Sequence, residues 1–208
     1  MLELSLEKAI SVLNDEGIII YPTETFYGIG CKISSEKAIS SVFQAKKRLL
    51  ALPLPTIVSD LEQVFRCTQL SKAMQNDVEN LAKAFWAGPL TLLLPARKNV
   101  STLLTGGTGK IAVRLSSHPV AVALAKGIGE PIVSSSANIS GKNPTACFQE
   151  LDEELLQRVN GCVNLSPKPK GGQASTIIDV LGSKQIKILR NGAISLEQLT
   201  EKGYALAE

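Results

Sequence analysis

The stretch that most constrains the fold is Pro131-Ile-Val-Ser-Ser-Ser-Ala-Asn-Ile-Ser-Gly141, in which an apolar run passes directly into a polar turn. Pro131–Val133 is typical of a short buried strand, and hydroxyls, an amide and a glycine follow where that strand would end. Such a turn presents side-chain hydroxyls and backbone N–H groups to an anionic or oxygen-rich ligand. A second polar turn, Tyr21–Gly28, follows the apolar run Gly17–Ile20. Two such turns, separated by more than half the chain, indicate one assembled site.

Apolar runs alternate with helical periodicity along the rest of the chain. Ser5 and Ser35 are good N-caps for amphipathic helices, the second of which ends in Lys46-Lys47-Arg48. Further helices are expected over Ser71–Phe85, Pro119–Lys126 and Gln149–Val159, and strands over Ile18–Tyr21, Pro53–Ser59, Leu90–Pro95, Ile111–Arg114, Ile132–Val133, Thr176–Val180 and Ile186–Leu189. This alternation predicts an α/β fold with helices packed against a sheet. The Pro-, Gly- and Lys-rich segment Ser166–Gln173 predicts a mobile loop, and residues 1–208 are expected to form a single domain.

The composition excludes several classes of protein. The chain has 208 residues, of which 44% are hydrophobic and 20% charged, as in ordinary soluble globular proteins. An aromatic content of 4% argues against a base-stacking nucleic-acid surface, and a net charge of +3 does not indicate a general nucleic-acid binder. The cysteines are scattered without a C-x-x-C pair, which predicts reduced thiols rather than zinc or disulfides. With no signal peptide and no membrane-length apolar run, we expect a soluble cytoplasmic protein.

Four cations are candidates for a site. Lys46 and Arg48 follow a predicted helix, where they either complement the helix dipole or clamp a phosphate. Arg114 ends an apolar strand and therefore needs an anionic partner, which is either an internal carboxylate or a ligand carboxylate or phosphate. Arg190 repeats this pattern and is either an edge cation or a ligand contact.

Several polar and aromatic residues have structural as well as functional interpretations. Thr23 and Thr25 either cap the turn that contains them or contact a ligand. Tyr27 and Trp86 are expected in the core. His118, the sole histidine, precedes a proline at a predicted helix start. It is expected to cap that helix or lie on the surface, because nothing indicates a Ser-His-Asp arrangement.

Together these segments resemble the YrdC/TsaC family, the L-threonylcarbamoyladenylate synthases. The matching segments are Tyr21–Gly30, Lys46-x-Arg48, Phe85–Thr91, Ala112–Arg114, Pro131–Gly141, Ser175–Asp179 and Ile188–Gly192. They cover nearly the whole chain, and their order and spacing make the resemblance specific. The chain resembles the short form of the family, without the additional C-terminal domain. The resemblance implies a YrdC-like fold, which is a twisted open mixed sheet with flanking helices around a large basic cavity.

The resemblance also implies a reaction. L-threonine, bicarbonate or CO2, and ATP would form threonylcarbamoyl-AMP and pyrophosphate. The product would pass to the tRNA threonylcarbamoyl-transfer proteins that make N6-threonylcarbamoyladenosine at position 37 of tRNA. Mg2+ would accompany ATP without protein ligands, tRNA or double-stranded RNA is a further possible partner, and no membrane is involved. The chemistry needs positioning and charge neutralisation, which cations and hydroxyls supply.

The site residues implied by the resemblance fall into two groups. Those that match the KxR and SxN motifs, and would hold the ATP phosphates or the carbamate as catalytic residues, are Lys46, Arg48, Ser136 and Asn138. Arg190 would close over the nucleotide. Arg114 would bind the threonine carboxylate, helped by Thr25, Ser134 and Ser175. Tyr21 and Thr23 would shape the cavity entrance.

Four positions depart from the family pattern. They are Leu49 where proline is usual, Leu52 where asparagine or lysine is frequent, Ile57 where histidine sometimes occurs, and Lys110 where threonine or serine is frequent. Their effect would be weaker ATP or threonine binding, a changed substrate preference, or none if other residues compensate. An alternative is an RNA- or nucleotide-binding paralogue without this activity, and retention of both motifs favours the enzyme. A carbamoyl-transferring module of the hydrogenase-maturation type is a third interpretation, but its zinc-finger and acylphosphatase-like segments are absent here.

Overall fold

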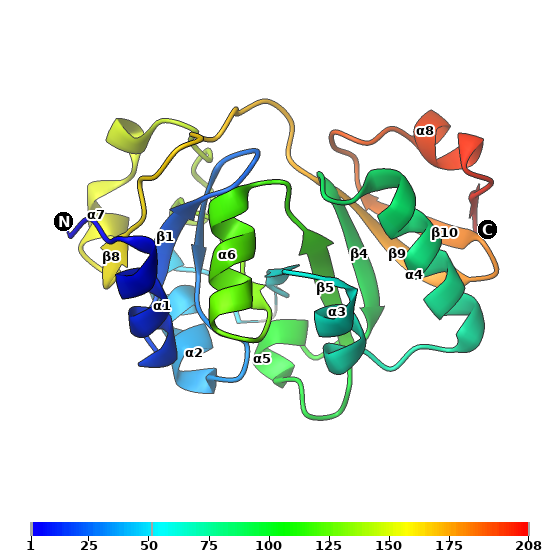
Figure 1. Cartoon of the computed structure of the whole chain (residues 1–208), viewed down its shortest axis with the longest axis horizontal. Coiled ribbons are helices and arrows are strands. Elements are labelled where there is room, and N and C mark those ends of the chain that lie inside the picture. The colour runs from blue at the N-terminus through cyan, green and yellow to red at the C-terminus, as the bar shows by residue number, and fades with distance from the viewer. Residues whose placement is uncertain (1, 51, 208) are drawn as a thin grey trace.

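The computed structural model describes residues 2–50 and 52–207, whose strands form two open sheets (Figure 1). The strands are β1 (Ile19–Pro22), β2 (Tyr27–Gly30), β3 (Pro55–Val58), β4 (Leu90–Pro95), β5 (Lys110–Leu115), β6 (Ile132–Val133), β7 (Ser135–Ser136), β8 (Gly161–Cys162), β9 (Thr176–Gly182), β10 (Gln185–Arg190) and β11 (Ala205–Leu206). The helices are α1 (Leu6–Asn14), α2 (Glu36–Lys46), α3 (Leu61–Cys67), α4 (Lys72–Phe85), α5 (Thr102–Thr105), α6 (Pro119–Gly127), α7 (Glu153–Leu156), α8 (Leu196–Glu201) and the 3-10 helix η1 (Phe148–Glu150). The α/β class is therefore confirmed.

The expectation of one sheet is wrong, because the segment that follows Pro131 is shared between two. The smaller sheet has the order β7-β2-β1-β8 and the larger one β11-β10-β9-β4-β5-β3-β6. Strand β6 pairs with β3, whereas β7, only one residue later, pairs with β2. Both sheets are mixed, since β1 runs antiparallel to β2 and parallel to β8, while β5 runs parallel to β3 and antiparallel to β4. Ser134 is the residue at which the chain changes sheets.

The two predicted N-caps, Ser5 and Ser35, are confirmed. Their hydroxyls accept backbone N–H bonds at 3.3 and 3.1 Å from the third residue of α1 and α2, and Ser71 caps α4 in the same way at 3.3 Å. At its other end, α2 stops at Lys47, whose φ of 50° is left-handed. That turn redirects the chain and carries Arg48 away from the helix axis.

Two hydrophobic clusters hold the helices against the sheets. In one of them α1 packs beside α6, as Figure 1 shows, with Ala9 and Leu13 facing Ala121 and Leu124. All four side chains are fully buried. Truncating Leu13 to alanine would cost about 2–5 kcal/mol, as for other buried leucines. The other cluster lies among α2, α4 and strands of both sheets.

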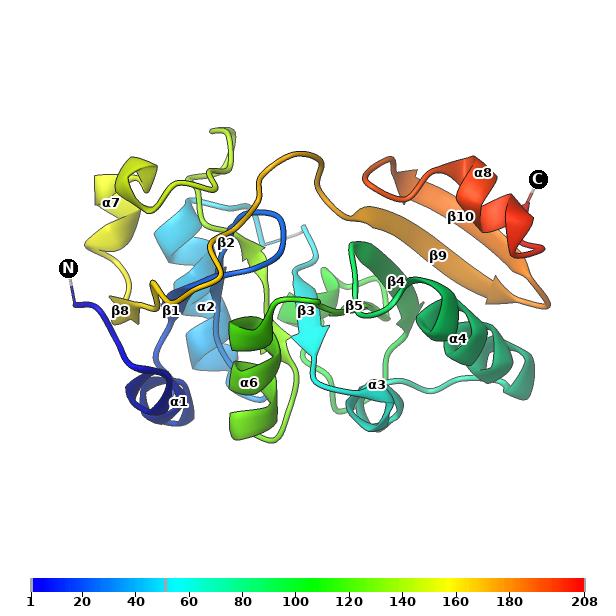
Figure 2. The same ribbon diagram turned by 45° about the horizontal axis from the view of Figure 1, so that its top comes forward.

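One predicted helix differs in the structure. Gln149–Val159 is not one helix, because Leu151 is extended (ψ 136°) and Asp152 starts a new turn by accepting the Glu154 and Leu155 N–H groups. The segment Ser166–Gln173, for which we predict mobility, contacts the β1–β2 turn, where Gly171 N donates to Thr25 O at 2.7 Å. Figure 2 shows the chain crossing here from β8 to β9. None of the helices within residues 2–50 and 52–207 has the length and apolarity needed to cross a membrane.

Candidate functional site

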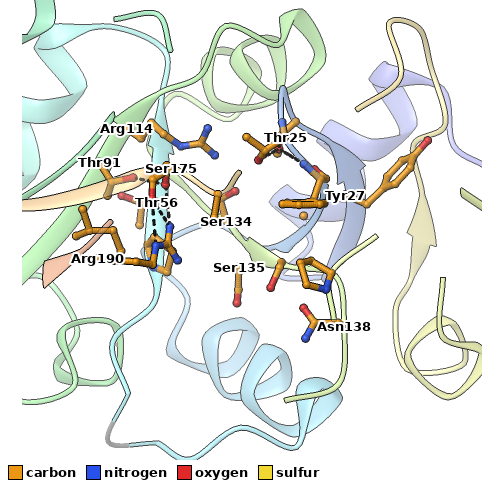
Figure 3. Close-up of a pocket in the computed structure, with 18 of the residues that line it drawn as sticks. Thr25, Tyr27, Thr56, Thr91, Arg114, Ser134, Ser135, Asn138, Ser175 and Arg190 are labelled. Atoms are coloured by element: carbon orange, nitrogen blue, oxygen red, sulfur yellow. Dashed lines mark hydrogen bonds between the residues drawn. The ribbon is translucent and has the colours of Figure 1, made fainter. Parts of the chain in front are cut away.

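A cavity of about 470 Å³ is lined by residues of both sheets and of the loops between them. One side consists of the β1–β2 turn and the residues around Arg48 and Ser134–Asn138. The other consists of positions on β3, β4 and β5, the start of β9 and the end of β10. Figure 3 shows side chains from these separate segments pointing toward a common space. The prediction that the two polar turns lie together is confirmed, because both line this cavity.

The Ser134–Asn138 loop is held mainly through its backbone. Ser134 N donates to Pro55 O of the larger sheet, and Ala137 N donates to Tyr27 O of the smaller one, both at 2.8 Å. A Cβ on Gly30 would overlap the Val133 carbonyl, so the close approach of the two segments requires glycine there. Within the described part of the chain, the hydroxyls of Ser135 and Ser136 make no hydrogen bond. The backbone thus fixes a loop whose side chains remain available to a ligand.

Asn138 and Arg48 both line the cavity and both keep an unused polar atom. Asn138 Nδ2 donates to Ile139 O at 2.9 Å and to Lys142 O at 2.7 Å, while its Oδ1 is buried without a partner. Arg48 Nη2 donates to Pro53 O at 3.1 Å, while its Nε is likewise buried and unpaired. An unsatisfied buried polar atom costs roughly 1–3 kcal/mol, so neither side chain is placed at the cavity by a complete set of protein hydrogen bonds.

Lys46 does not line the cavity but holds the Ser134–Asn138 loop through its backbone carbonyls. Its ammonium donates to the backbone carbonyls of Ser136 and, at 2.6 Å, of Asn138, and the residue is 1% exposed. Burial, together with the nearby Arg48 charge, lowers the pKa of Lys46 to about 7. The two carbonyl acceptors favour the protonated form. Any effect of Lys46 on a ligand therefore passes through the position of the Ser136–Asn138 loop.

On the opposite side, Arg190 is fixed by Ser175. Arg190 Nε and Nη2 donate to Ser175 O at 3.0 and 2.7 Å, and Nη2 also donates to Ser175 Oγ at 2.9 Å. Ser175 Oγ lies 2.9 Å from Thr91 Oγ1, and Figure 3 shows the three side chains joined. Thr91 and Thr56 line the cavity but were not predicted as site residues. The only indication of them in the sequence was that each is the single threonine in an otherwise apolar strand.

Arg114 has an internal carboxylate as its partner, one of the two alternatives expected. Glu24 pairs with Arg114 Nη1, and Glu24 in turn accepts a hydrogen bond from the Ser116 hydroxyl. Burial lowers the pKa of Arg114 to about 10, so it stays charged at neutral pH. Arg114 nevertheless lines the cavity, and Glu24 was not predicted as a site residue. The signal for it was an acid between two turn threonines.

The residues of the β1–β2 turn divide between structure and site. Thr23 caps its turn by accepting the Thr25 and Phe26 N–H groups at 3.3 Å and donating to Phe26 O at 2.7 Å, and it also lines the cavity. Thr25 lines the cavity as predicted. Tyr21 does not: it is fully buried, and its hydroxyl donates to Val133 O at 2.9 Å. The expectation that Tyr21 shapes the entrance is wrong.

The expected structural roles are mostly confirmed. Tyr27 is 1% exposed and its ring lies in the core, pointing away from the cavity that the residue also lines (Figure 3). Trp86 packs against the core and is partly buried. His118 caps α6, because its Nδ1 accepts the Val120 N–H at 3.3 Å. It is 2% exposed, so the alternative of a surface position is wrong.

The four departures from the family pattern lie outside the cavity lining. Ile57 is fully buried in the α1–α6 cluster, and Leu49 and Leu52 are exposed. Lys110, at the opposite end of β5 from Arg114, pairs with Asp179 at 2.6 Å. Where the family pattern frequently has threonine or serine, this chain therefore has a lysine that forms an ion pair with Asp179 of β9.

Metal ligands are scarce around the cavity. No aspartate or glutamate belongs to its lining. Across residues 2–50 and 52–207, no three His, Cys, Asp or Glu side chains are grouped so as to hold a metal ion. The cavity walls can therefore offer a ligand cations, hydroxyls and amides.

Comparisons with known proteins agree on one family. The Sua5/YciO/YrdC family model, described as "Telomere recombination", matches residues 11–192. The threonylcarbamoyl-AMP synthase of Stenotrophomonas maltophilia is 35% identical over 164 residues, which are 79% of this chain and 88% of that protein. The threonylcarbamoyl-AMP synthase of Pyrococcus abyssi is 33% identical over 197 residues, which are 95% of this chain. This chain spans only 56% of the length of the Pyrococcus protein.

Solved structures show the same fold. Pyrococcus abyssi Sua5 complexed with L-threonine is 29% identical and superposes with a TM-score of 0.87 over 99% of this chain and 61% of that one. E. coli YciO is 22% identical, with a TM-score of 0.77 over 93% of this chain and 92% of that one. At that identity, YciO shows the fold alone.

Proposed function

Since this chain belongs to the Sua5/YciO/YrdC family, we propose that it condenses L-threonine, bicarbonate or CO2, and ATP into threonylcarbamoyl-AMP and pyrophosphate. One observation carries the proposal: a single cavity is lined by the three arginines Arg48, Arg114 and Arg190 together with Asn138. Relatives at 33–35% identity are threonylcarbamoyl-AMP synthases, and one related structure is a complex with L-threonine. Cations on two sides of a small cavity suit a reaction between an amino acid and a nucleotide.

The arrangement supports separate binding sites for threonine and for ATP within the cavity. Arg114 would bind the threonine carboxylate, with hydrogen bonds from Thr25 and Ser134. On the other side, Arg48 and Asn138 would bind the ATP phosphates or the carbamate, with Ser136. Arg190, held by the Ser175 carbonyl and hydroxyl, would contact the nucleotide. Lys46 would act through the loop carbonyls it holds rather than by direct contact.

The proposed reaction needs no covalent enzyme intermediate. The threonine amine attacks the carbon of CO2 and loses a proton, which gives a carbamate. A carbamate oxygen then attacks the α-phosphorus of ATP, and pyrophosphate leaves in line. Fixed cations and hydroxyls aid this step by holding the reactants together and stabilising the charge that moves onto the leaving group. Because the cavity lining has no carboxylate, Mg2+ would enter with ATP, bound to its phosphates.

The decisive test is a product assay. Purified protein is incubated with ATP, Mg2+, bicarbonate and one amino acid at a time, and the acyl-adenylate is sought by mass spectrometry. We expect threonylcarbamoyl-AMP with threonine, and no product when bicarbonate or threonine is omitted. Absence of product together with tight RNA binding would instead favour the RNA- or nucleotide-binding paralogue. If the product forms, transfer to tRNA by cytoplasmic threonylcarbamoyl-transfer proteins is the step we propose next.

A further inference from the structure

Glu24 pairs with Arg114 and is not itself part of the cavity lining. It sits in the β1–β2 turn between Thr23 and Thr25, which do line the cavity. Its side chain is 11% exposed and that of Arg114 is 9% exposed. Glu24 therefore contacts a cavity-lining arginine through an ion pair that is almost closed to solvent.

The two carboxylate oxygens of Glu24 have different partners. Oε1 pairs with Arg114 Nη1, while Oε2 accepts the Ser116 hydroxyl. Ser116 Oγ also accepts the N–H of His118 at 3.1 Å, where α6 begins. The carboxylate is thus fixed between a strand that carries Arg114 and the start of a packed helix. A carboxylate held at both oxygens fixes the guanidinium bound to it.

The remaining edge of Arg114 is free. No hydrogen bond in the described part of the chain uses its Nε or Nη2, and neither of these atoms is fully buried, whereas Nη1, which pairs with Glu24, is. Arginine binds a carboxylate with two parallel N–H bonds when one edge of its guanidinium is open and its plane is fixed. Arg114 has such an edge, and the residue lines the cavity.

We propose that Glu24 is a positioning residue, which holds Arg114 by Nη1 so that the Nε–Nη2 edge faces the carboxylate of the amino-acid substrate. This inference rests on the proposed function and adds a determinant of amino-acid binding to it. Glu24 does not compete with the substrate, because the two carboxylates use different nitrogens of one guanidinium. Glu24 also balances a buried charge that would otherwise be unpaired.

A substitution that keeps the shape of Glu24 tests this role. E24Q retains an amide oxygen near Arg114 but loses the charge that orients the guanidinium. We expect the KM for threonine to rise about 10-fold or more, in the range for a weakened charge-assisted hydrogen bond, while the KM for ATP stays within twofold. E79Q, a substitution at an exposed position on α4, serves as the matched control and leaves both constants unchanged. Thermal unfolding and circular dichroism confirm that each variant is folded.

A double-mutant cycle separates positioning from general structural damage. If Glu24 acts only through Arg114, then E24Q in an R114M background leaves the KM for threonine where R114M alone puts it. S116A, which removes only the hydroxyl that holds Glu24, should raise the same KM by a few-fold and show the same non-additivity. S116A also keeps the test valid if E24Q does not fold.

The outcomes distinguish the two proposals. Wild-type protein that neither binds threonine nor forms its acyl-adenylate refutes the proposed function and this inference with it. Active wild-type protein refutes the positioning role alone if E24Q has the normal threonine KM, or if E24Q raises the KM for ATP as much as that for threonine. The positioning role is also refuted if E24Q weakens threonine binding further in the R114M background.

Discussion

The two walls of the cavity differ in how far protein contacts fix their polar side chains. The sheet wall, which we define as Thr91, Arg114, Ser175 and Arg190, is bonded to itself and to the protein behind it. The loop wall, which we define as Arg48, Ser135, Ser136 and Asn138, is fixed mainly through backbone contacts and leaves polar side-chain atoms without protein partners.

Because of this difference, we expect the two walls to contribute differently to ligand binding. Because protein partners fix the side chains of the sheet wall, its geometry exists before a ligand arrives, and binding costs little reorganisation. On the loop wall, the hydroxyls of Ser135 and Ser136 have no hydrogen-bond partner among the described residues, so a ligand can bind them without displacing a protein contact. Changes on the loop wall should therefore affect turnover more than stability.

The largest effects are expected from Arg48→Ala and Asn138→Ala. Each should lower kcat/KM about 100-fold or more, as when a group that stabilises transition-state charge is removed. R48A should change the free energy of unfolding little, whereas N138A should cost roughly 1–2 kcal/mol because Nδ2 bonds two carbonyls. Steady-state kinetics and urea unfolding measure both, with the exposed Arg66→Ala as control. An R48A protein that unfolds yet keeps its specific activity would make Arg48 a structural residue.

A smaller effect is expected on the sheet wall from Ser175→Ala. The hydroxyl that accepts from Arg190 is lost, but the Ser175 carbonyl still holds the guanidinium at 2.7 Å. Since a hydrogen bond to a charged group contributes about 1.5 kcal/mol, we expect kcat/KM to fall about 10-fold. Thr91→Val should act in the same direction. A loss as large as that of R48A would mean that the two walls do not differ as described.

A pH effect is expected beneath the loop wall, at Lys46. Its pKa in the folded protein is lowered to about 7, from an ordinary value of 10.5. As pH rises through this window, the ammonium that holds the loop carbonyls loses its proton, so turnover should fall a few-fold. Stability should change in the opposite direction, because the unfolded chain binds this proton more tightly and rising pH then favours the folded state.

Lys46→Met provides the control for that effect. Turnover and thermal unfolding are measured between pH 6.5 and 9.5, approximately spanning the titration expected for a lysine of lowered pKa. The variant should lack the part of each pH profile that belongs to Lys46. Identical profiles for wild type and K46M would show that another group titrates.

The smallest effect on activity is expected from Lys110→Ala. Lys110 pairs with Asp179 outside the cavity lining, and Asp179 Oδ1 already lacks a partner. Removing the lysine should lower the free energy of unfolding by roughly 1–2 kcal/mol, because it leaves a largely buried carboxylate unpaired. The KM values for ATP and threonine should not change. An increased KM for ATP would mean that the ATP site reaches the start of β5.

Local patterns predicted the elements well where their causes were local. The serine caps of α1, α2 and α4 and most strand positions follow from residues within a few positions of each other. The prediction of one helix over Gln149–Val159 was wrong because it rested on helical periodicity and did not take account of Asp152 as a new N-cap. The division of Ile132–Ser136 between two sheets could not be predicted, because it depends on pairing with β3 and β2, which are distant in the chain.

By itself, the sequence determined the α/β class, the family, and which hydroxyls, amides and cations are available to a site. Only the tertiary structure decided how those groups are used. Lys46 holds carbonyls 90 and 92 residues away, and the Glu24 carboxylate meets a hydroxyl 92 residues away. The physical reason is that burial and hydrogen-bond partners depend on which distant segments pack together. A sequence motif indicates which side chains are present, whereas tertiary packing determines which of their atoms remain free to bind a ligand.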